Sequence, residues 1–101
     1  MNKNDIKFKI RQAIEENPFK MDIERASLFG SYVNGVPRED SDVDLLIEFS
    51  PDARIGFFSL VGIKEDMERI IEKPVDLLTS EAISKYFKQE VLKQAEVVYE
   101  R

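Results

Sequence analysis

The residues with the clearest chemical potential are Gly30-Ser31 and Asp42-Val43-Asp44, with ten residues between Ser31 and Asp42. Gly30 has no side chain, so a backbone or a ligand can approach closely at this point. Ser31 offers a hydroxyl, and the N–H groups of a turn that follows it can bind phosphate. Residues two apart in a strand point to the same side, so Asp42 and Asp44 should project together. The sequence therefore predicts a phosphate-binding turn beside a pair of carboxylates.

A divalent cation and a third carboxylate would complete this pair. Two adjacent carboxylates raise each other's pKa unless a cation lies between them, and their oxygens suit Mg²⁺ bound jointly with substrate phosphates. Asp76 is the candidate for the third, because it interrupts the apolar run 75–78 and would lie beside the pair if the two strands are neighbours. Three carboxylates around two cations support in-line phosphoryl or nucleotidyl transfer, and the third could accept the proton of an attacking hydroxyl.

Each of these features also has a purely structural interpretation. A Gly-Ser pair is commonly only a turn, and an Asp-X-Asp after a serine can be a solvated strand entrance or a helix cap. A single aspartate in an apolar strand can lie at an edge or in a loop. The joint pattern favours function, because three separate coincidences would otherwise be needed. The aromatic pairs at 57–58 and 86–87 lie in segments with helical spacing, and they could also form surfaces that face a partner.

Three segments have the apolar spacing of amphipathic helices. The first can be capped by Asn4 or Asp5 and ends at 17–18, before a proline, and the second covers 57–71. The third follows residue 80. Its expected inward-facing residues are Ile83, Phe87 and Val91, with Leu92 as a further candidate. Four basic residues of the first helix are expected to form one solvated face, namely Lys3, Lys7, Lys9 and Arg11.

Short apolar runs between these helices predict strands that place the candidate site. The runs at 25–29, 43–49 and 75–78 have the composition of buried strands, and the apolar tail 97–99 predicts an edge strand. Gly30 stops the first run, and a brief helical turn can follow it. This order predicts an α+β fold, a small mixed sheet packed against helices, in a single domain that spans residues 1–101.

The composition excludes several classes of chemistry. The 101 residues include no His and no Cys, which rules out a Ser-His-Asp triad, a thiolate zinc site, a cysteine nucleophile and a disulfide framework. The net charge of −5, acidic in both halves, argues against general nucleic-acid binding. A signal peptide is not expected at the N-terminus, and no run approaches the roughly 20 apolar residues of a membrane span. We therefore expect a cytoplasmic protein.

The motif set resembles the minimal nucleotidyltransferase family of the DNA-polymerase-β-like superfamily, along almost the whole chain. The residues that flank the motifs agree as well: Leu28-Phe29, Ser41, Leu45-Leu46, Leu77-Leu78 and Val97-Val98-Tyr99. The resemblance implies a nucleotidyltransferase fold in which Asp42, Asp44 and Asp76 are catalytic and bind Mg²⁺, with Asp76 as third ligand or base. It also implies that Gly30 and Ser31 bind a nucleoside triphosphate. The activity implied is transfer of a nucleoside monophosphate to a hydroxyl, with release of pyrophosphate.

The resemblance also implies a partner, because this short chain has no residues left for a domain that selects the acceptor. Members of the minimal family are typically paired, as antitoxins, with a helical HEPN toxin, and resemble enzymes that attach AMP to a tyrosine of that partner. We therefore expect a protein adenylyltransferase that uses ATP and forms a hetero-complex or a homo-oligomer.

One position departs from the family pattern and supports a rival interpretation. Members commonly read Gly-Ser-X-Ala-Arg-Gly, whereas Asn34 stands here in place of the arginine. A positive charge that could meet phosphate is therefore missing. The alternative is a catalytically degenerate binding module that neutralises its HEPN partner by contact alone.

Overall fold

The computed structural model describes residues 2–35, 41–80 and 85–101, without the side chains of residues 34 and 85–88. Its helices and strands follow one another in the predicted order. Their bounds are α1 (Lys3–Glu15), the 3₁₀ turn η1 (Lys20–Asp22), β1 (Ile23–Phe29), α2 (Ser31–Asn34), β2 (Val43–Phe49), α3 (Phe57–Ile71), β3 (Val75–Thr79), α4 (Lys85–Gln94) and β4 (Glu96–Glu100). Among the described ranges, no helix is long and apolar enough to cross a membrane.

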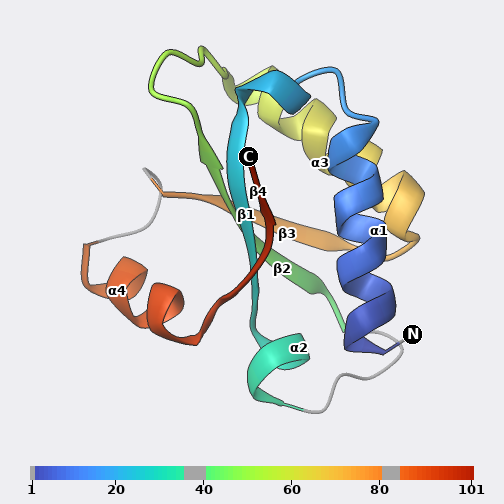
Figure 1. Cartoon of the computed structure of the whole chain (residues 1–101), viewed down its shortest axis with the longest axis vertical. Helices are drawn as coiled ribbons and strands as arrows, with labels where there is room; N and C mark the ends of the chain where they lie inside the picture. The colour runs from blue at the N-terminus through green and yellow to red at the C-terminus, as the bar shows by residue number, and fades with distance from the viewer. Residues whose placement is uncertain (1, 36–40, 81–84) are drawn as a thin grey trace.

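The four strands form one mixed sheet in the order β3-β2-β1-β4 (Figure 1). β1 runs antiparallel to both β2 and β4, whereas β2 and β3 are parallel neighbours joined through α3. A parallel pair needs a crossover connection of this kind, because the chain must return to the same end of the sheet. The predicted α+β fold with a small mixed sheet is confirmed, and the predicted edge strand is β4.

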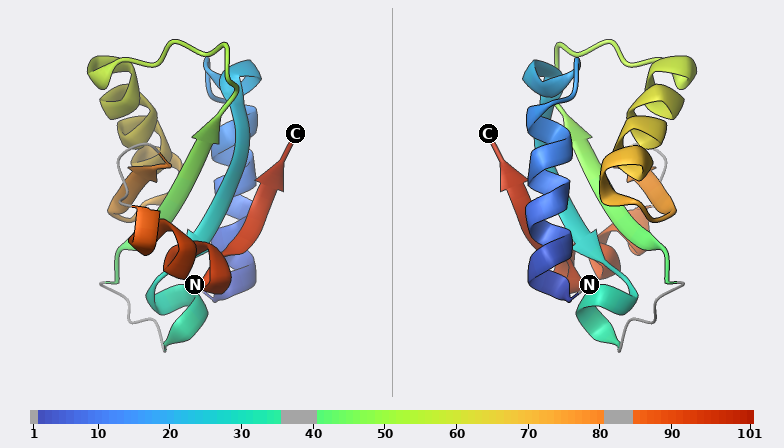
Figure 2. Two further views of the ribbon diagram at one scale, coloured as in Figure 1. Left: turned by 90° about the vertical axis from the view of Figure 1, so that its left-hand side faces the viewer. Right: turned by 90° about the vertical axis from the view of Figure 1, so that its right-hand side faces the viewer.

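The sheet separates two helical layers (Figures 1 and 2). α1 and α3 cover one face, and α4 lies on the opposite face. Val43, Leu45 and Ile47 of β2 belong to the core cluster that includes the apolar residues of α1 and α3. Successive residues of a strand point to opposite faces, so Asp44 lies on the face that α1 and α3 leave uncovered.

The prediction for the last helix is confirmed only in part. Val91 is buried, as expected, but Leu92 is 41% exposed and does not face inward. The expected inward side chains of Ile83 and Phe87 lie outside the described residues.

The predicted cap of α1, Asn4 or Asp5, was wrong by two or three residues. Asn2 is the N-cap: its Oδ1 accepts a hydrogen bond from the Asp5 backbone N–H at 2.9 Å, and an Asp5 carboxylate oxygen accepts from the Asn2 N–H at 3.2 Å. This reciprocal arrangement is a capping box, which satisfies two donors that a helix start otherwise leaves without partners. Asp5 is therefore the second member of the cap and not the cap itself.

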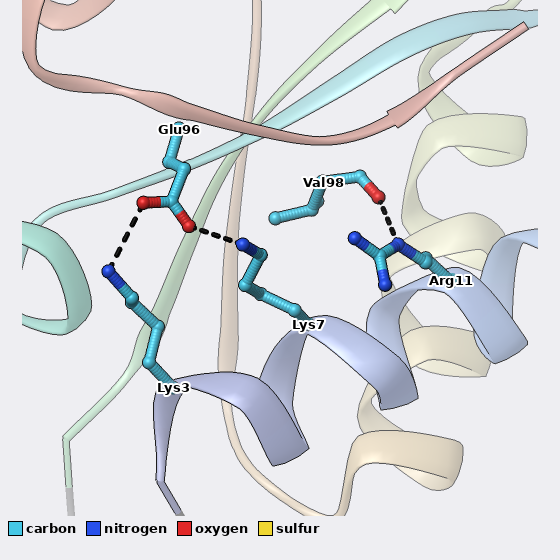
Figure 3. Close-up of polar contacts among 5 residues, drawn as sticks. All are labelled: Lys3, Lys7, Arg11, Glu96 and Val98. Carbon is cyan, nitrogen blue, oxygen red and sulfur yellow. Dashed lines mark hydrogen bonds and ion pairs between the residues drawn. The ribbon is translucent and has the colours of Figure 1, made fainter.

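The basic residues of α1 do not form the solvated face that the sequence suggested (Figure 3). Lys3 and Lys7 both reach Glu96, at 3.1 and 2.6 Å, and Arg11 Nε donates to the Val98 carbonyl at 2.7 Å. These hydrogen bonds, Lys7 first and Lys3 second, lower the pKa of Glu96. The helix thereby covers part of the exposed edge of β4, a sheet edge that would otherwise offer free pairing groups.

Candidate active site

Gly30 makes the turn between β1 and the single helical turn α2. Its backbone has φ +75° and ψ −146°, a conformation almost restricted to glycine. In the turn that follows Gly30, the Val33 N–H donates to the Gly30 carbonyl at 3.0 Å, and the Gly35 N–H donates to the Ser31 carbonyl at 3.1 Å. The predicted strand, glycine and helical turn are all present, and Ser31 is the first residue of the turn.

The carboxylate of Asp44 lies against Gly30, in the space that a side chain would need. Phe29, the residue before the glycine, pairs with Asp44 across β1 and β2. A Cβ built on Gly30 would overlap Oδ2 of Asp44 and lie 3.0 Å from its Cγ. The absence of a side chain at Gly30 therefore allows a carboxylate to lie beside the turn. The sequence did not predict this contact, because it depends on the register of two strands.

The register of β2 and β3 places Asp76 next to Asp44. The two residues are directly aligned in the parallel pair, between the aligned neighbours Val43 with Val75 and Leu45 with Leu77. Asp42 precedes β2 by one residue and is exposed, as is Asp76. The two strands are neighbours, which is the condition under which the sequence places Asp76 beside the pair, and three aspartates gather near the start of β2 and β3.

The three aspartates interact electrostatically. Burial raises the pKa of Asp44, and the nearby charges of Asp76 and then Asp42 raise it further. Among the described residues, no three acidic, His or Cys side chains stand close enough to enclose one metal ion. The carboxylates are therefore near enough to repel one another, but they offer a cation only part of its ligands. Mg²⁺ commonly takes one or two carboxylates and completes its shell with water and substrate phosphates, which fits this donor set.

The raised pKa of Asp44 predicts how a neutral variant behaves. A carboxyl whose pKa is higher in the folded than in the unfolded protein stabilises the fold while it is protonated. This stabilisation is fully present below the unfolded-state pKa, about 3.9, and is lost as the pH rises through the higher folded-state pKa. At neutral pH the ionised Asp44 therefore destabilises the fold. We expect Asp44→Asn to raise the melting temperature of the nucleotide-free and metal-free protein near pH 7, and to change it little below about pH 3.

Thermal melting of both proteins over this pH range measures the effect. Asp66→Asn is the matched control, because it makes the same chemical change on the surface of α3, where Asp66 forms an ion pair with Arg69. A melting temperature at pH 7 that is equal to the wild type, or lower, would contradict the electrostatic interpretation of the site.

A glycine turn that leads into a helical turn, set against two neighbouring strands with aspartates, defines a class of enzyme. Carboxylates that can bind a divalent cation beside a phosphate-binding turn are the elements of in-line phosphoryl or nucleotidyl transfer. The family model described as "Polymerase beta, Nucleotidyltransferase" matches residues 8–101. The chain belongs to this nucleotidyltransferase family and is one of its minimal members, as the sequence resemblance indicated.

Two relatives carry the name of a more particular activity. The "Putative protein adenylyltransferase MJ0435" of Methanocaldococcus jannaschii is 37% identical over 95 residues, which cover 94% of this chain and 96% of the relative. The "Protein adenylyltransferase MntA" of Thermococcus cleftensis is 34% identical over 77 residues, or 76% of this chain and 74% of the relative.

Solved structures share the fold. The "Structure of putative minimal nucleotidyltransferase" matches with a TM-score of 0.76 and 25% identity, over 94% of each chain. A "toxin-antitoxin with AMP-PNP" matches with a TM-score of 0.77 at 20% identity, over 94% of this chain and 73% of that one. A tri-AMPylated HEPN toxin of Shewanella oneidensis in complex with its MNT antitoxin matches at 0.71 and 17%, over 98% and 73%. At 20% and 17% identity, the similarity to these two structures shows a shared fold and nothing more.

Proposed function

We propose that this chain transfers AMP from ATP, with Mg²⁺, to a tyrosine hydroxyl of a HEPN-type toxin and thereby acts as its antitoxin in the cytoplasm. The observation that carries the proposal is the position of Asp44, which lies against the Gly30 turn on one side and beside Asp76 on the other. A triphosphate held at Gly30 and Ser31 would lie next to the carboxylates. The activity named for two relatives and the AMPylated toxin bound to a structural neighbour support the choice of AMP and of the acceptor.

Each residue of the site has a role in the proposed reaction. Gly30 and Ser31 bind and orient the triphosphate through backbone N–H groups and the serine hydroxyl. Asp42 and Asp44 would hold Mg²⁺ jointly with phosphate oxygens, and the bound ion would neutralise phosphate charge during the displacement. The acceptor oxygen forms a bond to the α-phosphorus while the bond to pyrophosphate breaks. Asp76 accepts the proton that the hydroxyl loses.

The rival function is a binding module that neutralises its partner without catalysis. Asn34, at the position where the family commonly has arginine, favours this alternative. The alignment of Asp76 with Asp44 favours the enzyme, because a module that acts by contact alone has no need for interacting carboxylates beside a glycine turn.

Intact-mass spectrometry of the partner distinguishes the two functions. A purified HEPN-type protein, ideally the one encoded next to this chain, is incubated with the chain, Mg²⁺ and each of the four ribonucleoside triphosphates in turn. We expect the toxin to gain the mass of one or more AMP groups with ATP alone, and peptide sequencing to place them on tyrosine. Asp42→Asn should abolish both the mass gain and the neutralisation, whereas Asp66→Asn on the surface of α3 should preserve both. Neutralisation by Asp42→Asn without any mass gain would establish the binding module instead.

A further inference from the structure

Two adjacent aromatic side chains protrude at the start of α3, away from the aspartates. Phe57 is 74% exposed and Phe58 is 88% exposed, and their rings meet edge to face with centroids 5.7 Å apart. Figure 2 shows the start of α3 and the segment before it at the end of the molecule opposite α2. Asp44 and Phe49, near the two ends of β2, are separated by about 17 Å at the usual strand rise. This surface is therefore distinct from the candidate active site.

A hollow lies beside Phe57, whose ring forms part of its wall. It has a volume of about 230 Å³ and opens between the ends of β2 and β3 and the start of α3. Apolar side chains such as Ile47, Ile55 and Leu60 line it together with Ser50, Thr79 and Ser80, and more of its exposed surface is polar than apolar. A cavity of about 150 Å³ is large enough to bind benzene, so this hollow has room for the edge of a phenyl ring. A protruding ring and a receptor for such a ring thus stand next to each other on one surface.

The charge of this surface differs from that of the rest of the chain. Residues 49–63 contain one acidic and one basic residue, Asp52 and Arg54, and both are exposed. The segment is therefore neutral, although the whole chain carries a net charge of −5. Two acidic molecules that approach through this surface avoid the like-charge repulsion that other approaches would meet. A strongly basic partner would find no excess of negative charge here.

We propose that this surface binds a second copy of the same chain. In a two-fold arrangement any contact made by one copy is repeated by the other, so Phe58 of each copy enters the hollow of its partner. Asp52 of each copy meets Arg54 of the other. The dimer leaves both candidate active sites open, because they lie at the other end of β2.

The small size of the surface determines how strong this dimer is. An aromatic side chain buries about 150–250 Å². The two rings of each copy therefore form an interface at or below the roughly 1,200 Å² of total buried area that marks weak and transient association. We expect a dissociation constant of about 10⁻⁶ M or higher, so that the dimer forms and dissociates with protein concentration.

Analytical ultracentrifugation of the full chain, from about 1 µM to about 1 mM, tests the proposal. The wild type should pass from monomer to dimer, and Phe58→Ser should weaken dimerisation at least about 10-fold. The matched control is Phe8→Ser on α1, where another phenylalanine is 66% exposed, and it should dimerise as the wild type does. A wild type that stays monomeric throughout, or two variants that behave alike, would overturn the proposal. A monomeric wild type whose binding to the HEPN protein is lost in Phe58→Ser would assign the surface to that protein instead.

A charge exchange tests the two-fold arrangement itself. Asp52→Arg places two positive charges on each surface and Arg54→Asp places two negative ones, so each variant alone should dimerise less than the wild type. An equimolar mixture of the two should dimerise again, because each new charge then faces its opposite. If all three samples dimerise as the wild type does, the arrangement is overturned. None of these residues belongs to the proposed catalytic site, so the outcome is independent of whether the chain transfers AMP.

Discussion

Asp76→Asn should lower the rate of nucleotidyl transfer by a factor of about 10² to 10⁴ while leaving the protein folded. Asp76 is exposed and stands beside Asp44 in β3. The substitution keeps the shape of the side chain but removes the negative charge and the ability to accept a proton. It also removes one of the charges that raise the pKa of Asp44, so the nucleotide-free protein should melt no lower than the wild type.

Single-turnover transfer and thermal melting, measured on the same preparation, check this result. Asp66→Asn on α3 is the control for the chemical change, since Asp66 forms a surface ion pair with Arg69 at 3.4 Å, a kind of contact that contributes little to stability. A variant that melts well below the wild type would show that Asp76 is structural. Transfer at the wild-type rate would remove Asp76 from the site.

The position of Asp76 could be predicted because the chain connection leaves little choice. An apolar strand, an amphipathic helix of 15 residues and a second strand form a unit whose strands are parallel. Sequential strands of such a unit are commonly neighbours in the sheet. The patterns at 43–49, 57–71 and 75–78 thus favoured the condition on which the predicted place of Asp76 depended, that the two strands are neighbours, and the structure meets it.

Apart from the local error at the cap of α1, the structure departs from the sequence prediction where a long-range contact decides the outcome. The basic residues of α1 repeat at helical spacing, which from the sequence alone is typical of a solvated face. Three of them, Lys3, Lys7 and Arg11, bind β4 because the last strand of the chain returns beside the first helix, and no local pattern encodes that return. The contact of Gly30 with Asp44 escaped prediction for the same reason: a glycine before a helical turn shows that space is needed, but not which group occupies it.

Gly30→Ala should lower both the stability of the fold and the rate of transfer, the latter by about 10² or more, the effect expected when reacting groups move by about 1 Å. The backbone conformation at Gly30 would cost an alanine about 1–3 kcal/mol. The new methyl group would also occupy the space of the Asp44 carboxylate, whose Cγ lies 3.0 Å from the built Cβ. Asp44 must then shift away from the turn where phosphate is expected to bind.

Two further variants separate these causes. Ser31→Ala removes only the hydroxyl next to the glycine, so it should weaken nucleotide affinity about 10- to 100-fold with little change in melting of the nucleotide-free protein. Adding Asp44→Ala to Gly30→Ala removes the carboxylate that the methyl group displaces. The double variant should therefore melt higher than Gly30→Ala alone, by more than Asp44→Ala raises the melting temperature of the wild type. If the changes in melting temperature caused by the two substitutions simply add, Gly30→Ala destabilises the fold through backbone strain alone, and the glycine does not position Asp44.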